Sequence, residues 1–125
     1  MNALFICDAG RNRSPTGVGV IRKLWGPDAT RNQAESIGFV ELNGKPHREI
    51  AQQLSKYDFI FCMDERTRTK LRRRYGIPPQ RIHNLDIPDR YDRADDRDFL
   101  QLEAILVLKL TPLLDAAVRD PEPDE

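Results

Sequence analysis

Residues 3–15 read ALFICDAGRNRSP, and this stretch decides the fold. The first five residues are continuously apolar, which predicts a strand over 3–7 that helices bury on both faces. After a polar turn, Ser14 stands where a helix N-cap belongs and Pro15 where the first helical residue belongs. The stretch therefore predicts a strand, a loop and a helix that ends at the Gly-Pro pair 26–27. The apolar stripe of this helix is expected to comprise Val18, Ile21, Leu24 and Trp25.

Apolar and polar segments alternate along the rest of the chain. Strands are expected over 33–37, 57–63 and 81–85, and helices over 47–55, 65–75 and 97–118. Strands that alternate with helices favour a parallel sheet that is covered on both faces. We therefore expect an α/β fold: one three-layer domain over residues 1–118, with a four-stranded parallel sheet flanked by helices, and an acidic tail over 119–125.

The composition is that of a globular protein with balanced charge. The 125 residues include 20 Lys or Arg and 20 Asp or Glu, which makes a nucleic-acid partner unlikely. Two cysteines and two histidines form no disulfide or zinc pattern, so we expect reduced thiols, no metal and no other cofactor. No window approaches the roughly 20 apolar residues of a membrane span. We therefore expect a cytoplasmic protein without a membrane partner, and its oligomeric state stays open.

Cys7 and Arg13 place a thiol and a guanidinium at the two ends of the polar loop. A loop that closes onto a helix N-terminus aims several backbone N–H groups at one point, and the helix dipole attracts an anion there. The same field favours the thiolate form of Cys7, which is the nucleophile. The planar fork of Arg13 can hold two oxygens of a tetrahedral oxyanion. The segment therefore predicts a phosphate-binding loop that begins with a cysteine nucleophile.

This segment resembles the phosphate loop of the low-molecular-weight protein tyrosine phosphatases, whose signature is Cys, five residues, Arg, Ser and usually Pro. Further motifs follow in that family's order: Ser36-Ile37-Gly38, Met63-Asp64 and Asp89-Arg90-Tyr91. The resemblance covers essentially residues 2–115. It implies a phosphomonoester hydrolase, most simply a protein tyrosine phosphatase that acts through a cysteinyl-phosphate without a metal. Its substrates would be phosphorylated proteins or small aryl phosphates.

The resemblance also implies roles for individual residues. Cys7 is the nucleophile, Arg13 clamps the phosphate, and Asp89 is the general acid. Phe39 and Tyr91 line the substrate mouth. The phosphate-binding residues are Asp8, Ala9, Gly10, Arg11, Asn12, Arg13 and Ser14, and the Ser14 hydroxyl donates to the thiolate.

The assignment of the general acid leaves alternatives. Asp86 and Asp92 share the loop of Asp89, and aspartates in loops mostly form turns. We favour Asp89 because Tyr91 follows it at the family's spacing.

The sequence departs from the family pattern at several positions. Gly10 stands where the family has an asparagine, Asn12 replaces a common second loop cysteine, and Arg90 replaces a proline that follows the acid. Gly17 and Gly19 replace small helix residues, and each is expected to cost an exposed helix about 0.8–1.0 kcal/mol relative to alanine.

Two other functions compete with hydrolysis. Arsenate reductase shares this fold and loop, but its chemistry needs further cysteines near the site, and Cys62 is expected inside the third strand as inert packing. A non-catalytic phosphate-binding regulatory module would need neither a thiolate nor an acid. The basic run over 66–74 is most simply a solvated helix face, and recruitment of an acidic or nucleic-acid-bearing substrate is its alternative.

Overall fold

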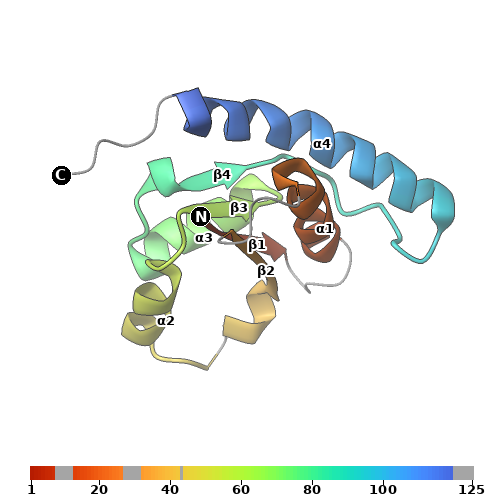
Figure 1. The fold of residues 1–125 in the computed structure, drawn as a ribbon. Helices are drawn as coiled ribbons and strands as arrows, with labels where there is room; N and C mark the ends of the chain where they lie inside the picture. The colour runs from red at the N-terminus through yellow and green to blue at the C-terminus, as the bar shows by residue number, and fades with distance from the viewer. Residues whose placement is uncertain (8–12, 27–31, 43, 120–125) are drawn as a thin grey trace.

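Strands and helices alternate along the part of the chain that the structure describes (Figure 1). This computed structural model describes residues 1–7, 13–26, 32–42 and 44–119. Its strands are β1 (Asn2–Cys7), β2 (Gln33–Gly38), β3 (Phe59–Cys62) and β4 (Ile82–Asn84). Its α-helices are α1 (Arg13–Trp25), α2 (His47–Leu54), α3 (Glu65–Tyr75) and α4 (Asp96–Arg119). Short 3-10 helices are η1 (Phe39–Leu42) and η2 (Pro79–Arg81).

The strands form one four-stranded parallel sheet in the order β2-β1-β3-β4. β1 therefore lies inside the sheet, where Cys7 is paired with Gly38 of β2 and Ile6 with Cys62 of β3. The expected α/β fold with a parallel sheet flanked by helices is confirmed. Strands β3 and β4 are each shorter than the sequence pattern suggested.

Alternate residues of β1 supply two separate cores. Phe5 and Cys7 belong to the cluster that packs beneath α1 and α4, whereas Ile6 belongs to the cluster beneath α2 and α3. Phe5 is fully buried and its ring stacks on that of Phe61, with 4.9 Å between the ring centroids. Burial of a side chain of this size contributes about 1.5–3 kcal/mol, so the two clusters hold the helices against both faces.

Helix α1 differs from the prediction at its start. It begins at Arg13, so Ser14 is a buried first-turn residue, and its expected N-cap role is wrong. Pro15 is still tolerated because a first-turn residue needs no intrahelical N–H partner. The helix ends as expected, with Gly26 at a φ of 80°.

The inward stripe of α1 also differs from the prediction. Val20 and Ile21 are buried, whereas Leu24 is 37% exposed. Gly17 is not an exposed glycine, because a Cβ placed there would lie 2.5 Å from the Phe5 ring. The stability cost that was expected for a glycine at position 17 of an exposed helix therefore does not apply. The absence of a Cβ at Gly17 is what allows α1 to pack this closely on the sheet.

The bounds of the later helices follow local signals. Asp64 caps α3 by accepting a hydrogen bond from the Thr67 N–H, at 2.8 Å, and the helix ends at Gly76, whose φ is 66°. Helix α4 runs one residue beyond its expected end, and the rest of the expected tail lies outside the described residues. Among the described helices, none has both the length and the apolar character that crossing a bilayer requires.

Candidate active site

The candidate nucleophile stands at the carboxyl end of the central strand. Cys7 is the last residue of β1, and its buried side chain lies in the cluster beneath α1 and α4. Arg13 is the first residue of α1. The loop between them, with the predicted phosphate-binding residues Asp8, Ala9, Gly10, Arg11 and Asn12, lies outside the described residues, so those assignments stay predictions.

Arg13 connects three segments at this end of the sheet. Its side chain is 3% exposed, and its Nη1 donates a hydrogen bond to the Ile87 carbonyl oxygen at 2.8 Å. The same Nη1 lies 3.8 Å from Oδ2 of Asp64, and Nε lies 3.6 Å from Oδ1 of Asp89. The loops after β3 and β4 thus fix the guanidinium beside the first turn of α1.

Two polar atoms of this first turn are buried without a hydrogen-bond partner among the described residues. They are Nε of Arg13 and Oγ of Ser14. A buried polar group without a partner costs free energy comparable to a lost hydrogen bond. The Ser14 hydroxyl is therefore available to an anion or a thiolate, whereas Nε of Arg13 already faces the Asp89 carboxylate at 3.6 Å.

Asp64 serves two groups with its two carboxylate oxygens. Oδ1 accepts from the Thr67 N–H and so caps α3, and Oδ2 faces Arg13. From the sequence, Asp64 is identified only within the motif Met63-Asp64, without a partner. The contact with Arg13 depends on the pairing of β1 with β3, and the motif Met63-Asp64 was its only signal in the sequence.

The three candidate acids have different surroundings. Asp89 is 63% exposed in its side chain, and within the described chain it is the one of the three that pairs with Arg13. Asp92 accepts a hydrogen bond from the Ala94 N–H at 2.9 Å, as a turn former does. Asp86 has a φ of 53°, and its backbone N–H donates to the Asn84 side chain.

The two residues expected at the substrate mouth are both buried. Tyr91 is 4% exposed, its hydroxyl accepts from Nη2 of Arg90 at 3.1 Å, and the Arg90 guanidinium lies over its ring. Phe39 is 5% exposed beneath the cations of Lys70 and Arg74. Their contact with substrate stays a prediction.

Cys62 lies in β3 beside β1, but on the other face of the sheet from Cys7. Its thiol donates to the Asp64 carbonyl oxygen at 3.5 Å. Burial, helped by the negative charge of Asp64, raises the pKa of the Cys62 thiol to about 12. This thiol is therefore protonated at neutral pH, and it is packing, as expected.

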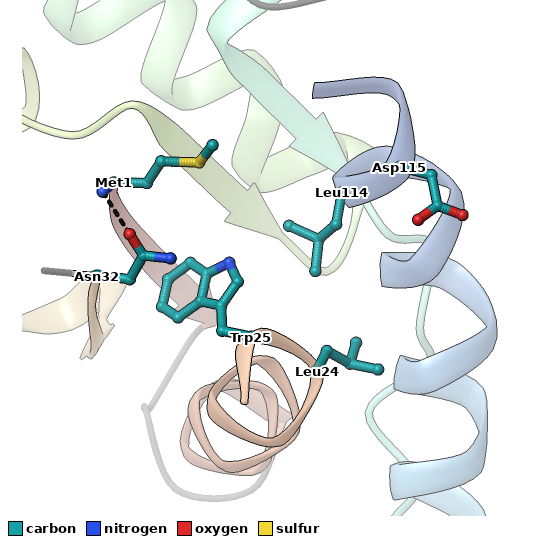
Figure 2. Close-up of a pocket in the computed structure, with 6 residues that line it drawn as sticks. All are labelled: Met1, Leu24, Trp25, Asn32, Leu114 and Asp115. Carbon is teal, nitrogen blue, oxygen red and sulfur yellow. Dashed lines mark hydrogen bonds between the residues drawn. The ribbon is translucent and has the colours of Figure 1, made fainter. Parts of the chain in front are cut away.

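A cavity of about 310 Å³ lies elsewhere in the fold (Figure 2). Its lining residues are Met1, Leu24, Trp25, Asn32, Leu114 and Asp115. Met1 precedes β1, so this cavity is at the opposite end of that strand from Cys7, and it contains none of the candidate residues. Among the described residues, no group of three or more His, Cys, Asp or Glu side chains is arranged to hold a metal ion.

Solved structures share this fold over nearly the whole chain. A low-molecular-weight phosphotyrosine phosphatase from Vibrio cholerae is 16% identical, with a TM-score of 0.73, and the match covers 97% of this chain and 99% of that one. A low-molecular-weight protein tyrosine phosphatase from Bacillus subtilis is 17% identical, with a TM-score of 0.71 and coverages of 96% and 99%. A mutant of the YwlE arginine phosphatase with a phosphorylated active-site serine is 14% identical, with a TM-score of 0.66 and coverages of 97% and 98%.

No protein-family model matches the chain, and no curated protein matches it in sequence. At identities this low, the structural likeness establishes the fold. The fold that the sequence motifs implied is therefore confirmed.

Proposed function

We propose that this chain, which has the fold of the low-molecular-weight protein tyrosine phosphatases, is a cysteine-dependent phosphomonoester hydrolase. The observation that carries the proposal is the buried guanidinium of Arg13, which the Ile87 carbonyl and two carboxylates hold at the end of the strand that Cys7 terminates. A buried cation built into the first turn of a helix favours a tetrahedral oxyanion.

The reaction has two displacement steps. The Cys7 thiolate attacks phosphorus in line with the leaving oxygen, so that an S–P bond forms while the P–O bond breaks. Asp89 gives its proton to the leaving oxygen. Asp89 then removes a proton from water, which attacks the cysteinyl-phosphate and releases inorganic phosphate and the thiolate.

The residues around the phosphorus supply charge and position. Arg13 neutralises the equatorial oxygens, whose charge is spread in the transition state. Ser14 donates its hydroxyl to the thiolate, a role that its buried, unpaired Oγ supports. Oδ1 of Asp89 lies 3.6 Å from Nε of Arg13, and this nearness to the proposed phosphate clamp supports Asp89 over its two neighbours as the acid.

The proposed substrates are aryl phosphates, with phosphotyrosine in proteins as the leading class. Two of the structural relatives are phosphotyrosine phosphatases by name, and a third is an arginine phosphatase. Phosphoarginine therefore belongs in the substrate panel. The two cysteines of the chain are both buried and form no disulfide framework, which fits a reducing compartment, so the proposed location is the cytoplasm.

The structure disfavours the reductase alternative. A reductase passes electrons through a second thiol close to the nucleophile, but Cys62 lies on the other face of the sheet from Cys7. A module that only binds phosphate needs neither a thiol nucleophile nor an acid, so the presence of both Cys7 and Asp89 argues against this alternative.

The test is a substrate panel of p-nitrophenyl phosphate and of peptides that carry phosphotyrosine, phosphoserine or phosphoarginine. We expect hydrolysis of the aryl phosphates, loss of that activity in Cys7→Ser, and retained activity in the matched control Cys62→Ala. A parallel assay with arsenate as substrate and thioredoxin as reductant tests for the arsenate reductase activity. Turnover by Cys7→Ser, or turnover of arsenate alone, would contradict the proposal.

A further inference from the structure

Helix α4 has an apolar outward face in addition to the face that packs on the sheet. The inward face buries Leu102, Leu106 and Leu110. On the other side Leu100 is 65% exposed and Leu108 is 71% exposed. None of the other helices or strands that the structure describes covers this outer side (Figure 1).

Five exposed residues and the half-buried Thr111 follow the spacing of a helix-pairing seam. Positions along the outward face recur in alternating steps of four and three: Arg97, Gln101, Ala104, Leu108, Thr111 and Asp115. This is the period of the a and d positions of a coiled coil. Leu100 and Val107 flank it and are also exposed. We call these eight residues the α4 seam.

We propose that the α4 seam binds the α4 seam of a second copy of this chain, with the two helices antiparallel. In an antiparallel helix pair whose two-fold axis passes beside residue 106 of each copy, Ala104 of each copy lies opposite Leu108 of the other. At the two contacts nearest the axis, the small Ala104 side chain therefore faces the large Leu108 side chain. This combination lets the two helices pack closely.

Charge complementarity selects this direction. The same pairing places Arg97 opposite Asp115 at both ends of the seam, because a two-fold axis repeats every contact. A parallel pair would instead place Arg97 against Arg97 and Asp115 against Asp115. Gln101 lies opposite Thr111 between these ends and the centre. The Thr111 hydroxyl donates to the Val107 carbonyl oxygen, so it can accept a hydrogen bond from the Gln101 amide.

The seam is short, and this sets the strength of the dimer. The helix rises about 1.5 Å per residue, so Arg97 and Asp115 are about 27 Å apart. A single helix pair of this length falls below the standard size of a stable interface. The dimer is therefore weak and reversible, and it forms as the concentration of the protein rises.

The first test is sedimentation equilibrium of the whole chain from about 1 µM to about 1 mM, a range that brackets weak association. The average mass should rise from the 14.4 kDa of one chain toward that of two. Leu108→Glu should remain monomeric, because it buries a charge at both contacts nearest the axis. Gln53→Glu adds the same charge at an exposed position of α2 and should dimerise like the wild type.

The second test reads the direction of the helices without touching an apolar residue. Arg97→Asp and Asp115→Arg should each weaken dimerisation about five- to tenfold, because each places like charges at both ends. The double variant should return to within about twofold of the wild type. Circular dichroism checks that every variant is folded.

Three results would overturn the proposal. If the wild type stays monomeric over the whole concentration range, the α4 seam does not bind a second copy of this chain. A dimer that Leu108→Glu does not weaken has its interface elsewhere. A double charge variant without recovery contradicts the antiparallel register.

Discussion

Cys7 and Cys62 stand on neighbouring strands, yet their sulfur atoms lie on opposite faces of the sheet. Cys62 is paired with Ile6, the residue before Cys7, and successive residues of a strand point to opposite sides. Cys7 therefore lies in the core beneath α1 and α4, and Cys62 in the core beneath α2 and α3. The sheet itself separates the two thiols.

This separation determines how the protein responds to peroxide. The Cys7 thiolate should oxidise to sulfenic acid and then to sulfinic acid, because no second thiol can trap the first product. We expect loss of activity, protection by bound phosphate, and recovery by dithiothreitol that declines with exposure time. Mass spectrometry should find Cys62 unmodified. A Cys7–Cys62 disulfide with full recovery after long exposure would contradict this prediction and reopen the reductase function.

Two glycines of α1 should respond to alanine in opposite ways. Gly17→Ala places a Cβ 2.5 Å from the buried Phe5 ring, and overpacking of this kind destabilises by about 1–3 kcal/mol. Gly19 has open space around it, so Gly19→Ala should stabilise by about 0.5–1 kcal/mol. Urea unfolding measures both. Equal effects at the two positions would show that α1 does not pack on Phe5 as closely as described.

The two roles of Asp64 can be separated by two substitutions. Asp64→Ser keeps a side chain that caps α3 but removes the carboxylate that faces Arg13. Stability should change little, whereas kcat/KM for an aryl phosphate should fall up to about fivefold, the value of a partly exposed ion pair.

Asp64→Ala removes both functions. It should show the same loss of kcat/KM together with about 1 kcal/mol of lost stability. If Asp64→Ser retains the full kcat/KM, Asp64 is a helix cap alone.

The role of Asp89 should appear as a dependence on the leaving group. Asp89→Asn cannot donate a proton, so its turnover should fall modestly for activated aryl phosphates and severely for phenyl phosphate. The matched variants Asp86→Asn and Asp92→Asn should show no such dependence. An equal loss across the series in Asp89→Asn, with a graded loss in a neighbour, would move the acid to that neighbour.

His83 should make stability depend on pH. Burial, followed by the charge of Arg68, lowers the pKa of His83 below its ordinary value of 6.5. The unfolded chain therefore binds this proton at a higher pH than the folded chain does. It follows that the free energy of unfolding declines as the pH falls below about 6.5.

Unfolding in urea at a series of pH values measures this effect. His83→Gln should remove part of the slope below pH 6.5, and the exposed His47→Gln should leave that part in place. Identical slopes in the wild type and His83→Gln would show that His83 protonates equally in both states.

Local patterns were enough to predict most of the fold. β1 and α3 could be placed from the sequence because their signals act within a few residues. These signals are the apolar run over 3–7 for β1, and Asp64 and Gly76 at the two ends of α3. The start of α1 was misplaced by two residues because Ser14 and Pro15 both suit a first helical turn.

Contacts between distant segments could not be predicted in the same way. The acceptor at Ile87 is a backbone carbonyl, which carries no side-chain signal, and it meets Arg13 only when β4 has joined the sheet. The crowding of Gly17 by Phe5 is likewise a property of the packed layers. The five residues between Cys7 and Arg13 remain assigned by sequence alone.

The bond between Arg13 and the Ile87 carbonyl spans 74 residues of sequence, and this has a consequence for biosynthesis. Cys7 and Arg13 are translated before the groups that orient the guanidinium, because Ile87 follows Arg13 by 74 residues. Parallel strands also pair late, since closing the long loops between them costs chain entropy before any contact forms. A nascent or partly folded chain thus carries its thiol and its arginine without the means to use them together, and catalytic competence would be acquired in the same event as the complete sheet.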